Sequence, residues 1–406
     1  MKLQLCGAAL MTALSFPVLA GEQPWAKWLM STVERHPIMQ AYQYENSAAK
    51  YQAQALTKPI YNPSLDTSME REGSETNFQI GLSSDIDWWG VREAQSEVGR
   101  LQAEQRALAV QIATNDLLAQ ILNAQIDVQL GQQGYELARM QVEQDLRLLR
   151  LTEQQLAAGE VNRTELAMAK SVVAQGMVAE NERFSAWLSA QKTLRTLAGE
   201  QAADVTINQA FFQAQLQVPA PQQLLALPAV KQARLEWLAA TASANQQQTA
   251  NKPVPNVGFG VGRQAGESLL SVNVSVPIQF RNNFNEVALA ARELALASEE
   301  RLHAQLRDTR EAVRNLAEQL QQTRLRFEQW QALHDNEMTE QVDVLQQRYA
   351  QGDLSLADYQ WQVQQLRDGM QAGLTLQKNY QQTYVAYLHI TAGLADVVSS
   401  LISSEQ

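Results

Sequence analysis

One order of motifs occurs twice in this chain, about 190 residues apart. The repeated landmarks are Pro37 and Pro228, Pro63 and Pro255, Ile86 and Ile278, Gly159 and Gly352, Gly199 and Gly393, and subtraction gives offsets of 191 to 194. Each copy predicts a helix, a proline-bounded pair of strands, a very long polar helix, a glycine-containing turn and a return helix. Such a period indicates a duplicated supersecondary unit whose two copies pack side by side.

The repeat divides the chain into three expected parts. Residues 1–20 are expected to be a signal peptide, residues 21–215 the first repeat and residues 216–406 the second. The first segment carries Lys2 as its only charge, then an apolar run and a small-residue end, which resembles a cleavable secretory signal. Cys6 is the only cysteine and precedes the apolar run, where a lipidation signal would not place it.

The composition narrows the classes of partner. Acidic residues number 43 against 32 basic ones, for a net charge of −11. This balance argues against a nucleic-acid partner, because phosphate contacts require clustered Lys and Arg. After residue 21 no stretch reaches the roughly 18 uncharged apolar residues of a spanning helix. If the chain enters a membrane, it does so with strands.

Each repeat contains two expected strands, at 64–71 and 77–87 and again at 256–263 and 268–279. Apolar residues alternate with polar residues or glycine along them, which is the period of a strand with one apolar face. Strands of this length can cross an outer membrane when tilted. Four strands cannot close a barrel alone, and lipid does not tolerate open edges, so strands from several copies would have to join. The alternative is a soluble sheet with one face on a core.

The longest expected elements are two helical hairpins. A helix over 91–158 returns over 162–198, and a helix over 285–350 returns over 354–392, while another helix, over 25–57, precedes the first strand pair. A helix of about 65 residues extends about 100 Å. Narrow apolar stripes favour coiled-coil pairing. The predicted fold class is mainly α with a small β part: internally duplicated hairpins forming a coiled-coil α-barrel, plus four strands per chain for a shared trimeric β-barrel.

The turns of these hairpins resemble those of a known family. Residues 156–166 read LAAGEVNRTEL and residues 349–359 read YAQGDLSLADY, with an acid six positions after the glycine in both. With the repeat, these motifs resemble the TolC family of outer-membrane efflux channels, the outer membrane factors. Residues 86–92, IDWWGVR, are similar to the strand-to-helix junction of the CzcC-like heavy-metal branch.

The resemblance implies a homotrimer in outer-membrane lipid, with most of each chain in the periplasm. Such a trimer is a passive exit duct that docks to a periplasmic adaptor (membrane fusion) protein and an inner-membrane pump, expected to be of the proton-driven RND type, with metal cations as one possible cargo. The residues themselves offer no phosphate-binding loop, nucleophile elbow or zinc helix, so neither an enzyme nor a cofactor is expected. The four histidines lack metal-ligand spacing.

The resemblance also suggests functional residues. Gly159, Arg163, Glu165 and Gly352 would lie at a periplasmic tip that docks the adaptor. Asp353 and Asp358 are candidates for an acidic gate, because carboxylates repeated around one axis attract cations. The alternative for both is a solvated helix start, where Asp serves as a cap. Trp361 stands where the family often has a further acid, which weakens the case for a double ring.

Three aromatic residues fall where strands meet helices, namely Trp88, Trp89 and Phe280. Aromatic side chains favour a membrane interface, and packing beneath the sheet is the equal alternative. For the whole protein, two further functions remain open at this point. One is a soluble periplasmic coiled-coil scaffold without a pore, and the other is an efflux adaptor protein, although an adaptor has one hairpin rather than two.

Overall fold

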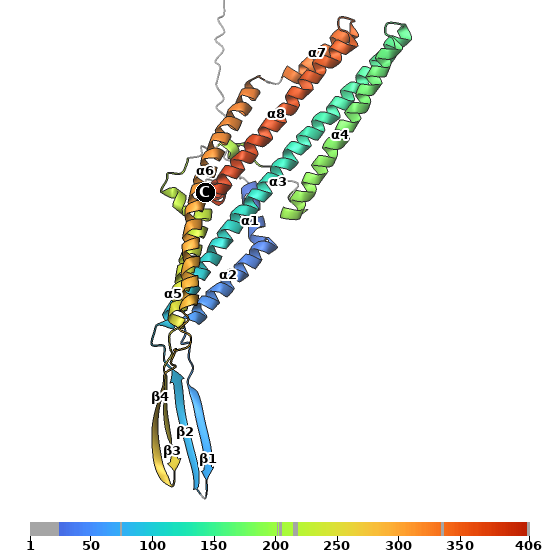
Figure 1. Ribbon diagram of the computed structural model, residues 1–406. Coiled ribbons are helices and arrows are strands. Elements are labelled where there is room, and N and C mark those ends of the chain that lie inside the picture. The colour runs from blue at the N-terminus through green and yellow to red at the C-terminus, as the bar shows by residue number, and fades with distance from the viewer. Residues whose placement is uncertain are drawn as a thin grey trace, which may run out of the picture.

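The computed structural model describes residues 24–73, 75–200, 202, 205–213, 218–333 and 337–403. The predicted signal segment, residues 1–20 with Cys6, lies outside these ranges. Within them the molecule is elongated, with a four-stranded sheet at one end and the turns of two helical hairpins at the other (Figure 1).

The elements of the second half follow the order of the first. The first half contains α1 (Pro24–Arg35), α2 (Pro37–Leu56), β1 (Ser64–Glu72), β2 (Glu75–Asp85), α3 (Val91–Ala158) and α4 (Arg163–Ala198). The short helices η2 (Gln209–Gln213) and η3 (Gln223–Ala226) lead to the second half, which contains α5 (Pro228–Ala250), β3 (Asn256–Gln264), β4 (Glu267–Ser275), α6 (Asn285–Leu333), α7 (Glu337–Ala350), α8 (Leu356–Ile390) and α9 (Leu394–Ser403). The duplicated helical hairpins and the small antiparallel sheet confirm the predicted fold class of the chain, mainly α with a small β part of four strands.

The sheet is a meander in the order β1-β2-β3-β4, with all neighbours antiparallel. Directly opposite residues share a face, so the register sorts the side chains. One face collects apolar residues from all four strands: Leu65, Met69, Phe78, Ile80, Leu82, Val257, Phe259, Val261, Leu270, Val272 and Val274. The other face carries polar residues or glycine, apart from Leu269. The alternation predicted from sequence is therefore a real two-faced sheet.

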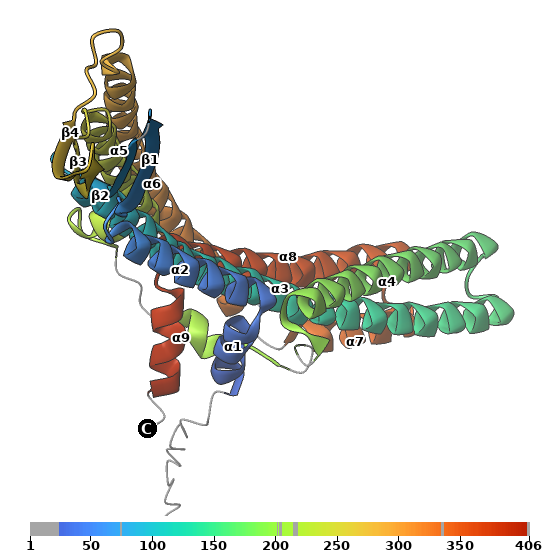
Figure 2. The same cartoon turned by 90° about the horizontal axis from the view of Figure 1, so that it is seen from below.

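The helices form a layer in the order α7, α8, α3, α4 (Figure 1). α3 lies inside this layer, between α4 and α8, while α4 and α7 lie at its two edges. α1 and α9 pack together against the middle of α3 (Figure 2). The main core sits at that level and joins α1, α3, α8, α9 and η2 through side chains that include Trp25, Leu29, Phe211, Tyr384 and Leu394, each at most 5 % exposed.

Three expected boundaries differ from the structure. The helix expected over 25–57 is two helices, because Pro37 begins α2 and His36 caps it: the Ile38 N–H donates to the His36 Nδ1, 3.2 Å away. β2 ends at Asp85 and β4 at Ser275, earlier than expected, and Pro277 lacks an N–H for a ladder. Of the helix expected over 285–350, the structure describes 285–333 as α6 and 337–350 as α7.

A helix that crosses a membrane must be both long enough and apolar enough. In the described ranges no single helix meets both requirements, and one pair meets them jointly: α8 and α9, which are bent by 104°.

The assignment of residues 21–215 and 216–406 to two repeats stays a prediction.

Candidate functional site: the helical tip and the apolar sheet

The two hairpin turns at the tip have the same backbone structure. Gly159 has φ +79° and Gly352 has φ +78°, the left-handed region that favours glycine. After Gly159, the Glu160 N–H donates to the Gln155 carbonyl at 2.9 Å, and after Gly352 the Asp353 N–H donates to the Arg348 carbonyl at 3.0 Å. Each is a Schellman motif, which satisfies carbonyls left free at a helix end. Both glycines are therefore required locally by the turn itself.

The helices that leave the two turns are also capped alike. The Asn162 Oδ1 accepts from the Glu165 N–H at 3.0 Å, and the Glu165 Oε2 accepts from the Asn162 N–H at 2.9 Å, which forms a capping box. In the second turn the Ser355 Oγ accepts from the Asp358 N–H at 3.1 Å and donates to the Asp358 Oδ2 at 2.6 Å. Glu165 thus belongs to a capping box, and Asp358 hydrogen-bonds to the cap residue of its helix, which is the kind of place that the helix-start alternative gave Asp358.

The remaining tip residues point to solvent. Arg163, Asp353 and Asp358 are exposed, and in the described part of the chain Arg163 forms no ion pair. Both turns lie at the same end of the molecule, opposite the sheet (Figure 1). The structure thus brings all six predicted tip residues to one end. Their roles in docking and gating stay predictions.

The second turn is supported by packing beneath it. A small core, which we call the tip core, joins α7 and α8 to α3 through Leu148, Val342, Leu345, Tyr349, Leu356, Tyr359 and Val363. The Tyr349 and Thr152 hydroxyls are 3.2 Å apart and both are buried. Burial raises the pKa of Tyr359 to about 12, so this phenol is neutral at physiological pH. The α7–α8 turn is therefore anchored to α3.

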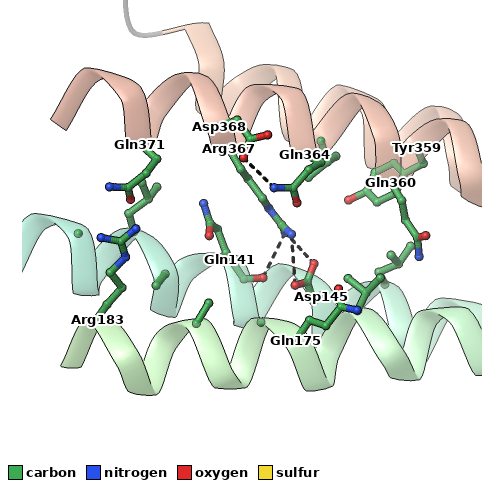
Figure 3. A pocket seen from close by; sticks show the side chains of 18 residues that line it. Gln141, Asp145, Gln175, Arg183, Tyr359, Gln360, Gln364, Arg367, Asp368 and Gln371 are labelled. Atoms are coloured by element: carbon green, nitrogen blue, oxygen red, sulfur yellow. Dashed lines mark hydrogen bonds and ion pairs between the residues drawn. The ribbon is translucent and has the colours of Figure 1, made fainter. Parts of the chain in front are cut away.

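Next to the tip core, a buried ion pair joins α3 to α8. The Arg367 Nη2 donates to the Asp145 Oδ1 at 2.7 Å and to the Gln141 carbonyl at 3.4 Å. The Arg367 side chain is 12 % exposed and the Asp145 side chain is 4 % exposed. Figure 3 shows the pair at the wall of a cavity of about 340 Å³ between α3, α4 and α8. Gly176 of α4 approaches closely: a Cβ there would lie 3.0 Å from the Asp145 Oδ2.

This pair is costly to bury. Burial raises the pKa of the Asp145 carboxyl, and the opposing effect of the Arg367 guanidinium is smaller. The Arg367 Nε also has no hydrogen-bond partner among the described atoms. The attraction between the two charges only partly offsets the free-energy cost of removing them from water. Removal of either residue would leave the other charge buried without a partner, which is strongly destabilising.

Sequence reasoning missed this pair. Its members are 222 residues apart in the chain, so no local spacing links them. The one available signal was a charged residue at an otherwise apolar step of each helix, since Leu148 follows Asp145 at i+3 and Val363 precedes Arg367 at i−4.

The strand-to-helix junction is held by polar contacts. Asp87 caps α3 by accepting from the Val91 N–H at 2.7 Å and from the Arg92 N–H at 3.0 Å. The Trp89 Nε1 donates to the Pro253 carbonyl at 2.7 Å, and the Lys252 ammonium lies 4.8 Å from the centre of the Trp89 ring. Trp89 therefore ties the junctions of the two repeats together.

The other two junction aromatics are free of the chain's own core. Trp88 is 69 % exposed and Phe280 is 79 % exposed. Within the single chain neither side chain packs beneath the sheet. Their place at a membrane interface stays a prediction that this exposure favours.

The apolar face of the sheet is as open as the aromatics. Apart from Val257, which is half-buried, its large side chains are exposed by between 37 % for Ile80 and 78 % for Met69, and no other element of the described chain covers them. The expected alternative, a soluble sheet with one face on the chain's own core, is thus not what the chain forms. A continuous apolar face of this kind marks contact with lipid or with another protein.

Metal ligands do not gather in the described ranges, which hold no group of three or more His, Cys, Asp or Glu placed to bind an ion. His389 instead contacts Asp116, with 2.6 Å between its Nε2 and the Asp116 Oδ1.

Known proteins share both the sequence pattern and the fold. The model of the outer membrane efflux protein family matches residues 28–200. The fold is similar to the outer membrane protein VceC of Vibrio cholerae, at 14 % identity and a TM-score of 0.73, over 93 % of this chain and 99 % of VceC. It is also similar to two outer membrane channels: CmeC of Campylobacter jejuni, at 15 % identity and a TM-score of 0.76, over 93 % and 88 % of the two chains, and MtrE of Neisseria gonorrhoeae, at 15 % and 0.72, over 92 % and 90 %.

None of the curated proteins compared with this chain matches its sequence. At these identities the solved structures establish the fold, and the family model supplies the link in sequence. The chain therefore carries the signature of the outer membrane efflux proteins over residues 28–200 and the fold of their TolC-like channels over nine-tenths of its length, which confirms the resemblance predicted from its turns.

Proposed function

We propose that three copies of this chain form a passive exit duct in the outer membrane, with the sheet in lipid and the helices in the periplasm. The observation that carries the proposal is the apolar face of the sheet, which is exposed on all four strands at the end of the molecule opposite the tip. In water such a face would be a liability, whereas in lipid it is the expected outer surface of a barrel wall.

A shared assembly is supported by the open edges of both layers. β1 and β4 each have one strand neighbour in the described chain, and α4 has one major helix neighbour, α3. α4 also exposes Met177, Phe184 and Leu188, which are 49 %, 37 % and 45 % exposed. Open strand edges are not tolerated in lipid, so the sheet requires a further chain on each side. A ring of copies would cover the edges of the sheet and of the helical layer together.

The tip is the proposed contact with the rest of an efflux system. Gly159, Arg163, Glu165 and Gly352 would face a periplasmic adaptor that links the duct to an inner-membrane pump of the RND type. Asp353 and Asp358 would recur around the axis and favour cations over anions. The exposure of Asp353 and Asp358 supports this role, and the capping contact of Asp358 is compatible with it. Metal cations remain a proposed cargo, on the likeness of residues 86–92 to the heavy-metal branch.

Membrane extraction tests the duct directly. We expect the protein to fractionate with outer membranes, to need detergent for extraction, and to show the mass of a trimer by light scattering after subtraction of the detergent. Reconstituted in planar bilayers, it should give stable conductance steps. A processed chain that is monomeric and soluble without detergent would refute the duct and favour a periplasmic scaffold.

Gating is tested separately, with Asp358→Asn and Asp353→Asn in the same bilayers. If these carboxylates line the entrance, each substitution should lower cation selectivity and weaken block by multivalent cations. Glu153→Gln, an exposed change on α3 near the tip, is the control. Unchanged selectivity in both aspartate variants would leave Asp358 with its capping role alone.

A further inference from the structure

The two strand hairpins of the chain have the same register, residue for residue. Ser64 pairs with Ser83 in the first hairpin, and Asn256 pairs with Ser275 in the second, which is a shift of 192 for both partners by subtraction. The same shift relates the turn ends, where Glu72 pairs with Glu75 and Gln264 pairs with Glu267. The sheet is thus two copies of one hairpin, with β1 equivalent to β3 and β2 equivalent to β4.

The pairing of β2 with β3 is therefore a joint between two copies of one hairpin. Ile80 pairs with Val261 there, and Gly81 pairs with Gly260. The joint is staggered, because Phe78 lies three residues after the start of β2 while its partner Arg263 lies one residue before the end of β3. Stagger of this kind is what a closed barrel needs between its strands.

We propose that β4 of one copy pairs with β1 of the next copy in the register that β2 has with β3 inside the chain. This inference rests on the proposed trimeric duct and specifies its joint. The shift of 192 turns the pair Ile80–Val261 into Val272 opposite Met69 of the next copy. In the same way Leu82–Phe259 becomes Val274 opposite Thr67, and Gly81–Gly260 becomes Asn273 opposite Ser68.

The side chains of the two free edges suit this register. On the apolar face Val272 meets Met69, so the open apolar surface continues from one copy to the next. On the polar face Ser271 faces Glu70 and Ser275 faces Asp66, which places hydroxyl donors opposite carboxylate acceptors and avoids like charges. Neither β1 nor β4 contains proline, so both edges can donate and accept along their length.

The competing registers are limited. A slip by one residue would turn one strand's apolar set to the polar face, so only even slips keep the faces matched. In one alternative register β4 is shifted by two residues along β1, so that the turns of the two neighbouring hairpins lie at the same height. This shift removes the stagger and sets Leu269 opposite Glu70 on the polar face. A slip by two in the other direction sets Val274 opposite Met69. These two registers are the alternatives that the experiment must separate.

Disulfide trapping in outer membranes reads the register. In a Cys6→Ser background, which removes the only native cysteine, two double variants are made: Met69→Cys with Val272→Cys, and Ser68→Cys with Asn273→Cys. Adjacent opposite pairs alternate between the narrow and the wide type, with Cα atoms about 4.5 or 5.5 Å apart, and both spacings are within disulfide reach. We expect oxidation to give a covalent trimer on non-reducing gels, which reductant converts to monomer.

Matched controls use the same cysteine with shifted partners. Met69→Cys with Leu270→Cys and Met69→Cys with Val274→Cys place the Cα atoms about 8 Å apart in the proposed register, beyond disulfide reach. Both should stay mostly monomeric on the gel. Ile80→Cys with Val261→Cys is the internal control, since its disulfide forms inside one chain and adds no mass. Each single-cysteine variant should give no covalent trimer.

The outcomes separate this inference from the duct itself. Trapping through position 270 or 274 in place of 272 overturns the register and leaves the trimer standing. A trimer by light scattering that no pair can trap overturns the pairing of β4 with β1. Monomers throughout, by mass and by gel, overturn the proposed duct and this inference together.

Discussion

α4 and α8 are the return helices of the two repeats, yet the chain buries them very differently. Of 36 residues in α4 the buried ones are Ala169, Val173 and Leu194, whereas 11 of 35 residues in α8 are buried. Both helices begin after the same turn and the same kind of cap. The difference therefore comes from position in the layer: α8 lies between its own repeat and α3, while α4 lies at an edge.

Duplication therefore fixed the local structure of the repeats and left their packing to differ. α8 acquired a buried charge, Arg367, and a row of buried tyrosines at Tyr380, Tyr384 and Tyr387. α4 kept exposed apolar residues at Met177, Phe184 and Leu188.

The largest effect is expected from Arg367→Leu. It leaves the Asp145 carboxylate buried without its partner, which costs about 3–5 kcal/mol of unfolding free energy. Urea unfolding in detergent should show the loss as an earlier transition. Arg183→Leu is the control, because Arg183 lines the same cavity from α4 and is exposed. Asp145→Leu combined with Arg367→Leu should recover most of the loss, and a double variant as unstable as the single one would contradict the argument.

The same variant should respond to pH. Burial raises the pKa of Asp145 in the folded chain, so the carboxyl binds a proton more readily when folded than when unfolded. Such a group stabilises the fold fully below its unfolded pKa, near 4, and this contribution is lost as the pH rises through the folded value. Without Arg367 the pKa rises further. The stability gap between Arg367→Leu and wild type should therefore narrow from pH 7 to about pH 5, and a constant gap would exclude Asp145 as its cause.

A smaller and matched effect is expected at the two turns. Gly159→Ala and Gly352→Ala each place a Cβ at a positive φ, which costs about 1–2 kcal/mol. Because the two φ angles agree within a degree, the two losses should be equal in thermal unfolding of the same preparation. Asparagine at either site should cost less than alanine. A loss confined to Gly352 would show that the tip core, rather than the turn, sets the cost.

The smallest effect on a single chain is expected from Leu188→Ser at the exposed edge of α4. Surface changes of this kind usually alter folding stability by no more than about 0.5 kcal/mol. The fraction of trimer at low detergent-solubilised concentration should nevertheless fall, as measured by light scattering. Leu388→Ser, on buried α8, is the contrasting variant and should unfold the chain instead. An unchanged trimer fraction for Leu188→Ser would remove α4 from the proposed interface.

Local patterns in the sequence were enough for the repeat, the turns and the faces of the strands. Gly159 and Gly352 indicate turns because glycine is the residue best suited to a positive φ. The alternation along 257–262 predicts the two faces of that strand because a strand has a period of two. Pro37 carried a signal as well, and the single helix expected over 25–57 overlooked it. The extent of the two repeats, and the roles of the tip residues, remain predictions.

The pairings between distant segments could not be predicted in this way. Asp145 and Arg367, or Trp89 and Pro253, meet only because the repeats fold against each other, and neither sequence neighbourhood records its partner. For the same reason the sequence identified the open sheet but did not identify α4 as an open helix. Its apolar residues are spaced like those of any amphipathic helix.

The uninterrupted course of α3 has a consequence for how such a molecule can change over time. Its 68 residues, about 100 Å of helix, separate the sheet from the tip as one uninterrupted helix. The length of α3 therefore sets the distance between the sheet and the tip. A lineage could lengthen or shorten that reach only by adding or removing whole helical turns in both repeats at once, since a change in one alone would leave the two tips at unequal heights.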